Sequence, residues 1–158
     1  MFELSALHRA STENHVTDTT RKLSFHVVAH RTDAHGSIAR CKSAELSLDT
    51  DLAGRVDAFN PAELLLAAVS ACIIKGIERV APMLKFRLRG VQVRINGVRQ
   101  DVPPRLESID YEILVDSDES EQRLALLHDN VRKYGTVFNT VAPGTRLSGV
   151  LRRQTEES

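Results

Sequence analysis

Cys72 is the residue of this chain whose type and setting best suit it to chemistry. The segment from Leu64 to Ile74 reads LLLAAVSACII, eleven residues without a charged side chain. A thiol in such a run is either inert packing, because free cysteine is among the most often buried residues, or a reactive group that other parts of the fold must activate. Lys75 follows three residues later and could approach the thiol on a helix, although helix lysines usually point to water.

Three histidines form the second group with possible chemistry. His26 and His30 share one face of an alternating segment, His35 lies just beyond, and three imidazoles can bind zinc or copper. No acidic or cysteine ligand follows at short spacing, and Lys22 shares the same face. We therefore interpret these histidines as solvent-facing, and we expect neither a metal nor another cofactor.

Composition limits the classes of protein that the chain can belong to. At 158 residues, with 42% apolar and 27% charged side chains, it fits one globular domain. Its 21 basic and 21 acidic residues cancel, which argues against a nucleic-acid partner. The longest uncharged run is too short to cross a bilayer, and the first residues lack the pattern of a signal peptide, so we expect a cytoplasmic protein with no membrane partner. In such a compartment Cys41 and Cys72 should be thiols.

The first half of the chain predicts strands followed by a long helix. Residues 1–20 are polar and are expected to form a tail or arm, which leaves one domain over residues 21–158. Alternation predicts a half-buried strand over Arg21–His30 and a second strand on which Ile38, Ala44, Leu46 and Leu48 face the core. Asn60 has the features of an N-cap, with Pro61 at the first helical position and Glu63 three residues after the cap. The helix that follows should reach about Val80 and end before Pro82.

The second half predicts two strands, a helix and a final strand. A strand over Phe86–Val98 changes its apolar parity at Gly90, which predicts a bulge there, and a second strand has Ile109, Tyr111, Ile113 and Val115 on one face. The helix after Ser117 should bury Leu124, Leu127, Val131 and Tyr134, with Gly135 as its C-cap. A short strand over about residues 145–152 ends the domain. This order indicates an α+β fold with a largely antiparallel sheet.

The long helix is apolar on nearly every side. A small sheet and one amphipathic helix cannot cover such a helix completely. A homodimer that shares its central helices would supply the missing cover.

The segment NPAELLLAAVSAC from Asn60 to Cys72 resembles the signature of the OsmC/Ohr family, the osmotically inducible and organic-hydroperoxide-resistance proteins. The resemblance continues through RGVQVRINGV and through YGTVFNT from Tyr134 to Thr140, and it covers most of the chain from about residue 21. It implies an OsmC-like α+β fold, with an antiparallel sheet, a long buried central helix and an intertwined homodimer whose sites lie at the subunit interface.

The resemblance also implies thiol-dependent reduction of hydroperoxides. The Cys72 thiolate would attack the peroxide and become a sulfenic acid. In the family a second cysteine then closes a disulfide, which an external dithiol reduces. An arginine near the end of the first strand holds the thiolate, and a glutamate just before the helix assists.

These roles transfer to the chain unevenly. The arginine corresponds to Arg31, or alternatively to Arg40, and either could instead be an ordinary strand-end arginine in water. The glutamate position falls on Ala62, and for the adjacent Glu63 we favour a structural role as the capping-box partner of Asn60 over a role in the site. Gly135 stands at the place of the second cysteine, and the parity of Cys41 puts it on the polar face of its strand, away from the core.

Two functions follow from this pattern. The first is a single-cysteine thiol peroxidase of oxidative stress defence, in which Cys72 reduces organic hydroperoxides and an external thiol or dithiol restores it. The second is a non-catalytic OsmC-fold module that binds a small apolar or thiol-reactive ligand, with Cys72 as packing.

Overall fold

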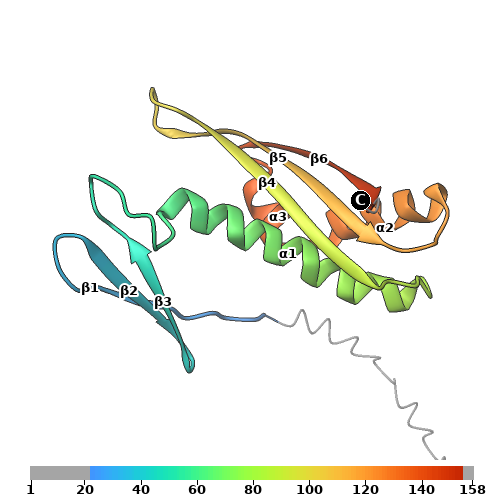
Figure 1. Ribbon diagram of the computed structural model, residues 1–158, viewed down its shortest axis with the longest axis horizontal. Coiled ribbons are helices and arrows are strands. Elements are labelled where there is room, and N and C mark those ends of the chain that lie inside the picture. The colour runs from blue at the N-terminus through green and yellow to red at the C-terminus, as the bar shows by residue number, and fades with distance from the viewer. Residues whose placement is uncertain (1–21, 155–158) are drawn as a thin grey trace, which may run out of the picture.

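The computed structural model describes residues 22–154, so the expected arm of residues 1–20 lies outside the described residues. Within this range the chain forms two three-stranded sheets and three helices, which confirms the α+β class (Figure 1). The elements are β1 (Val28–Arg31), β2 (Gly36–Cys41), β3 (Ala44–Asp49), α1 (Pro61–Met83), β4 (Gly90–Gln100), β5 (Arg105–Asp116), α2 (Glu121–Tyr134), α3 (Thr136–Val141) and β6 (Arg146–Arg153). None of the helices in the described range has the length and apolar composition needed to cross a membrane.

The N-terminal sheet is an antiparallel meander of β1, β2 and β3. The prediction of a single strand over residues 38–48 is wrong, because the chain reverses between Cys41 and Ala44 and pairs these two residues across a hairpin. Lys42 makes this turn with φ 57°, in the left-handed region that glycine or asparagine usually occupies. The turn therefore contains no glycine from which it could have been predicted.

The first predicted strand is shorter and more exposed than expected. Pairing begins only at Val28, and the apolar side chains of the preceding segment are exposed: Leu23 by 66%, Phe25 by 85% and Val27 by 60%. Figure 1 shows the β1–β3 sheet standing apart from the β4–β6 sheet. Outside the named strands, a parallel bridge joins Leu48 to Phe59. In the single chain, the apolar side chains of Leu23, Phe25 and Val27 thus lack the cover that their alternation predicts.

Helix α1 begins where the sequence predicts. The side chain of Asn60 accepts hydrogen bonds from the backbone N–H groups of Ala62 and Glu63, and the Glu63 carboxylate accepts one from the Asn60 N–H at 2.9 Å. The predicted end is wrong, because α1 continues through Pro82 to Met83. A proline removes only its own N–H, and the Leu84 N–H still donates to Val80 O at 3.0 Å, which completes the last turn.

The second sheet has the order β4-β5-β6, with β4 antiparallel and β6 parallel to β5. Its inner face confirms the predicted alternation of β5, whose residues Ile109, Tyr111, Ile113 and Val115 are all buried. The predicted bulge at Gly90 is wrong. Residues 86–88 belong to the connection after α1, β4 starts at Gly90, and the register shift lies between Val98 and Arg99.

Helices α1, α2 and α3 pack on the inner face of this sheet and close the core. Leu124, Leu127 and Val131 of α2 are buried as predicted, whereas Tyr134 is 51% exposed. Gly135 ends α2 at the predicted position, but with an ordinary φ of −76°, because it also caps the start of α3. Helix α3 was not expected from the sequence, since its residues TVFNTV read as a turn.

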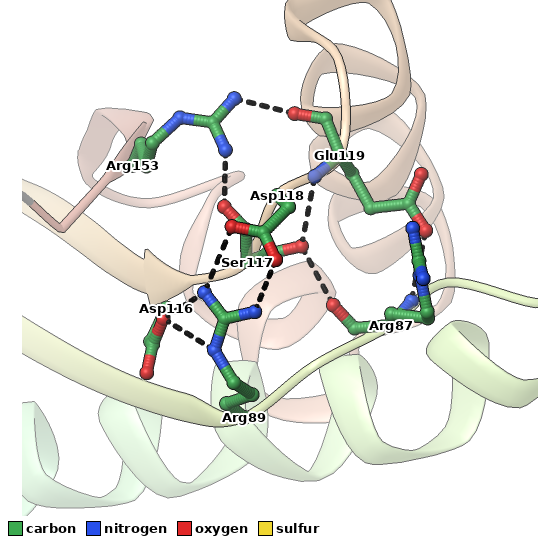
Figure 2. A network of polar contacts seen from close by, with 7 residues as sticks. All are labelled: Arg87, Arg89, Asp116, Ser117, Asp118, Glu119 and Arg153. Atoms are coloured by element: carbon green, nitrogen blue, oxygen red, sulfur yellow. Dashed lines mark hydrogen bonds and ion pairs between the residues drawn. The ribbon is translucent and has the colours of Figure 1, made fainter.

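A polar network fixes the connection between β5 and α2 (Figure 2). The buried Ser117 hydroxyl donates to Arg87 O at 2.6 Å and accepts the Glu119 N–H at 3.2 Å. Arg153 donates to the carbonyl oxygens of Ser117 and Glu119. The Arg87 N–H donates to the Glu119 carboxylate and so holds the pKa of this group below its ordinary value. The network joins the segment before β4, the end of β6 and the segment before α2 at one end of the sheet.

Candidate functional site

Cys72 lies in the middle of α1 and is half-buried. Val69 and Ile73 beside it are fully in the core, whereas Ala68 and Lys75, one turn before and after it, are exposed. The thiol therefore stands at the boundary between the packed face and the open face of the helix. In the described part of the chain, no hydrogen bond joins its Sγ to another residue.

Gly135 lies directly against this thiol. A Cβ atom at position 135 would lie 3.4 Å from Cys72 Sγ and 2.9 Å from Phe138 Cβ. The backbone between α2 and α3 is thus the wall that the thiol faces, and that wall carries no side chain at the point of contact. The pairing of a mid-helix residue with a residue 63 positions later comes from the packing of α1 against α2 and α3.

Glu63 is engaged at the start of α1. Its carboxylate completes the capping box with Asn60, in agreement with the structural interpretation of this residue. It precedes Cys72 by nine positions, which places it about 13 Å away along the helix axis. Ala62, at the position of the family's glutamate, is half-buried in the same first turn. Neither residue contacts Cys72 within the same chain.

The two candidate arginines lie on the β1–β3 sheet. Arg31 ends β1 opposite Ser37, and its side chain is exposed. Arg40 is also exposed and donates through Nε to Glu45 at 2.7 Å, with Nη1 3.5 Å from His30 Nε2. In the described chain neither guanidinium forms an ion pair or hydrogen bond at Cys72, and Figure 1 shows their sheet apart from the middle of α1.

The histidines and the second cysteine also lie in this N-terminal part. His26 is exposed, and His35 Nδ1 lies 2.6 Å from Asp51 Oδ2. Among residues 22–154, no cluster of three or more His, Cys, Asp or Glu side chains is arranged to hold a metal ion. Cys41 is a half-buried free thiol at the end of β2, beside the hairpin turn.

Sequence reasoning missed a partly buried polar pair between β5 and α2. Tyr111 Oη lies 2.9 Å from His128 Nε2, and the Tyr111 ring packs edge-on against Phe138 with centroids 6.1 Å apart. Burial raises the pKa of Tyr111 and lowers the pKa of His128. The sequence position of His128 could have revealed it, because this residue lies on the inner face of α2 among the buried Leu124, Leu127 and Val131.

A groove of about 270 Å³ lies between the end of α1 and the start of β4. It is lined by Glu78, Ala81, Pro82, Phe86, Leu88, Arg89, Gly90 and Val91. Cys72 and Gly135 do not line it, so this groove is separate from the candidate site.

Comparison with solved structures supports the fold. The chain is similar to an OsmC-like protein of Mycoplasma pneumoniae, with a TM-score of 0.77 and 18% identity over 84% of this chain and 99% of that one. It is also similar to an organic hydroperoxide resistance protein OsmC of Legionella pneumophila, with a TM-score of 0.63 and 18% identity over 82% and 96%. The third is the organic hydroperoxide resistance protein OhrB of Bacillus subtilis, with a TM-score of 0.60 and 11% identity over 82% and 98%. At these identities the likeness concerns the fold.

Sequence comparison identifies the family. No curated protein sequence matches the chain. The sequence profile of the OsmC-like proteins matches residues 53–148, which is more than half of the chain and includes both Cys72 and Gly135. The chain therefore belongs to the OsmC-like protein family.

Proposed function

We propose that this protein reduces organic hydroperoxides through Cys72 and serves in defence against oxidative stress. The observation that carries the proposal is the half-buried Cys72 thiol in the middle of α1, at the edge of the core and in contact range of the α2–α3 junction. The names of the Legionella pneumophila and Bacillus subtilis proteins, which refer to organic hydroperoxide resistance, support the same activity.

The proposed reaction begins with nucleophilic attack. The thiolate of Cys72 attacks the terminal oxygen of the hydroperoxide, the O–O bond breaks, and the alkoxide takes a proton and leaves as an alcohol. The sulfur is then a sulfenic acid and has lost two electrons to the peroxide.

Activation of the thiol is assigned to Arg31 in a homodimer. A guanidinium beside sulfur favours the thiolate, and Arg31 has no carboxylate within ion-pair distance in the described range, whereas Arg40 is paired with Glu45. The exposed apolar side chains of Leu23, Phe25 and Val27 favour a second copy as the partner of this sheet. In such a dimer, Arg31 of one chain would complete a site that holds Cys72 of the same or the other chain.

One observation favours the alternative, a binding module without catalysis. In the described single chain, no cationic side chain forms an ion pair or hydrogen bond with Cys72, and Glu63 is occupied by the helix cap. If the dimer brings no guanidinium to the sulfur, Cys72 remains an ordinary thiol. The fold would then bind a small apolar or thiol-reactive ligand.

A single reaction separates the two functions. The fully reduced protein is mixed with cumene hydroperoxide, trapped with a sulfenic-acid reagent and followed by intact mass, beside a Cys72→Ser control. A rapid gain of one oxygen or of the trapped adduct that requires Cys72 supports the peroxidase. An unreacted thiol after minutes, in protein shown to be folded by circular dichroism, supports the binding module.

A further inference from the structure

The structure leaves oxidised Cys72 without a thiol of its own chain to react with. The sequence contains only two cysteines, Cys41 and Cys72. Cys41 lies at the β2–β3 hairpin, in the sheet that stands apart from the middle of α1 (Figure 1). A disulfide requires the two Cβ atoms to approach within about 4.5 Å. The fold of one chain does not bring these residues together.

The position that could have supplied a thiol is Gly135. A Cβ atom there would lie 3.4 Å from Cys72 Sγ, which is close to the spacing between the Cβ of one cysteine and the Sγ of the other in a disulfide. The φ of −76° at this residue is accessible to any amino acid, but a Cβ here would lie 2.9 Å from Phe138 Cβ, so a side chain at position 135 requires Phe138 to shift. The α2–α3 junction is therefore built at the distance of a disulfide partner but offers no sulfur.

In the single chain, Cys72 has an open side next to short side chains. Ala68, one turn before it, is exposed and ends in a methyl group, and Ala71 next to it is exposed as well. Attack on a sulfenic acid needs the incoming sulfur to reach Cys72 Sγ along a line that side chains leave open. In the single chain, the exposed Lys75 is the long side chain on this side of the helix, and the two alanines leave the rest of it uncovered.

On this basis, and given the proposed hydroperoxide reduction, we infer that oxidised Cys72 is restored through an obligatory mixed disulfide with a small external monothiol. In the first step the monothiol attacks the Cys72 sulfenic acid, an S–S bond forms between the two sulfurs, and water leaves. In the second step a further monothiol attacks the external sulfur and releases the Cys72 thiol together with a small disulfide. Two monothiols thus supply the two electrons that one hydroperoxide removed.

The test uses the full chain and its Gly135→Cys variant. Each protein is oxidised with one equivalent of cumene hydroperoxide, mixed with the monothiol β-mercaptoethanol and followed by intact mass, with Cys41→Ser in parallel. For the wild type we expect a transient mercaptoethanol adduct on Cys72, recovery of the free thiol, and two monothiols consumed per hydroperoxide. Gly135→Cys should instead lose two hydrogens as an internal disulfide and form the adduct more slowly.

The outcomes separate the two hypotheses. A wild-type sulfenic acid that forms but is not reduced by β-mercaptoethanol overturns the mixed disulfide and leaves the proposed reduction standing. A Cys41–Cys72 disulfide, within or between chains, also overturns it, and Cys41→Ser would abolish that species. Absence of any sulfenic acid rejects the proposed function and the inference with it. Since the wild-type adduct is decisive alone, the test does not depend on the folding of Gly135→Cys.

Discussion

Tyr111 Oη and His128 Nε2 lie 2.9 Å apart and link the centre of β5 to the inner face of α2. A neutral imidazole accepts a hydrogen bond from the phenol at Nε2, whereas a protonated imidazolium cannot. Burial favours the neutral form and lowers the pKa of His128, and Arg132 one turn later adds to this effect while Asp129 opposes it. The pair is therefore a pH-sensitive contact inside the core.

The first prediction is that the free energy of unfolding falls as the pH drops through the ordinary pKa of histidine. The pKa of His128 is lower in the folded protein than in the unfolded chain, where it is about 6.5, so just below that pH the unfolded state binds more protons. His128→Gln keeps a hydrogen-bonding group and should remove this part of the pH dependence. Urea midpoints from about pH 7.5 to about pH 5.5 check it, since most carboxylates titrate lower. If the wild type and His128→Gln lost the same free energy of unfolding between these pH values, His128 would not be the group responsible.

The second prediction concerns Gly149, which pairs with Tyr111 across the parallel strands. A Cβ at position 149 would lie 2.3 Å from Tyr111 O and 2.4 Å from its ring, and the backbone of a central strand cannot move away. Gly149→Ala should lower the free energy of unfolding by about 3 kcal/mol. In Gly144→Ala the nearest atom is Val141 O at 3.9 Å, and a change below about 1 kcal/mol is expected. Similar urea midpoints for the two variants would show that β6 is not held at this register.

The third prediction ranks two residues of the network in Figure 2. Arg89 binds both Asp116 and Asp118, but its side chain is 52% exposed, and exposed ion pairs contribute about 0–1 kcal/mol. Ser117 is 1% exposed, and its hydroxyl satisfies two backbone groups, so Ser117→Ala should cost about 1–3 kcal/mol. In urea unfolding, Ser117→Ala should therefore have a lower free energy of unfolding than Arg89→Gln. Added salt should reduce the loss of unfolding free energy caused by Arg89→Gln but not the loss caused by Ser117→Ala. A larger loss for Arg89→Gln than for Ser117→Ala would refute the prediction.

Much of the fold could be predicted from local sequence patterns, such as those at the start of α1 and along the strand β5. The capping box at Asn60 involves residues within three positions, and the alternation of β5 follows from one buried face. The hairpin at Lys42 could not be predicted, because a lysine takes the left-handed turn position. The parallel pairing of β6 with β5 depends on how the finished sheet closes, which no short segment encodes.

The candidate site divides in the same way. Cys72 stood out because the run from Leu64 to Ile74 around it has no charged side chain, and the resemblance placed Gly135 at the position of the family's second cysteine. That a Cβ at position 135 would lie 3.4 Å from Cys72 Sγ depends on the packing of α1 against the α2–α3 junction, which the periodicity of one segment cannot predict. His128 was missed because one polar residue on an apolar face reveals its partner only when the opposite strand is in place.

The fourth prediction is that the protein forms a homodimer through the exposed apolar side chains of Leu23, Phe25 and Val27. Phe25 is 85% exposed, and burial of such a side chain contributes about 1.5–3 kcal/mol. Phe25→Ser should raise the dissociation constant of the dimer at least about tenfold. Val102→Ser, at a side chain 89% exposed in the β4–β5 turn, is the matched control and should leave it unchanged. Sedimentation velocity measures both, and a monomeric wild type at micromolar concentration would reject the dimer.

The last prediction assigns the activating cation. If Arg31 reaches Cys72 in the dimer, Arg31→Gln should slow sulfenic acid formation about tenfold or more near pH 7, because an ordinary cysteine is only a few per cent thiolate there. The rates of wild type and variant should converge at alkaline pH, where a thiol ionises without help from a guanidinium. Convergence distinguishes charge from a loss of folding, which would lower the rate at every pH. Arg40→Gln should match the wild type, since Arg40 is paired with Glu45. A loss confined to Arg40→Gln would transfer the role to Arg40, and no loss in either variant would mean that neither guanidinium activates the thiol.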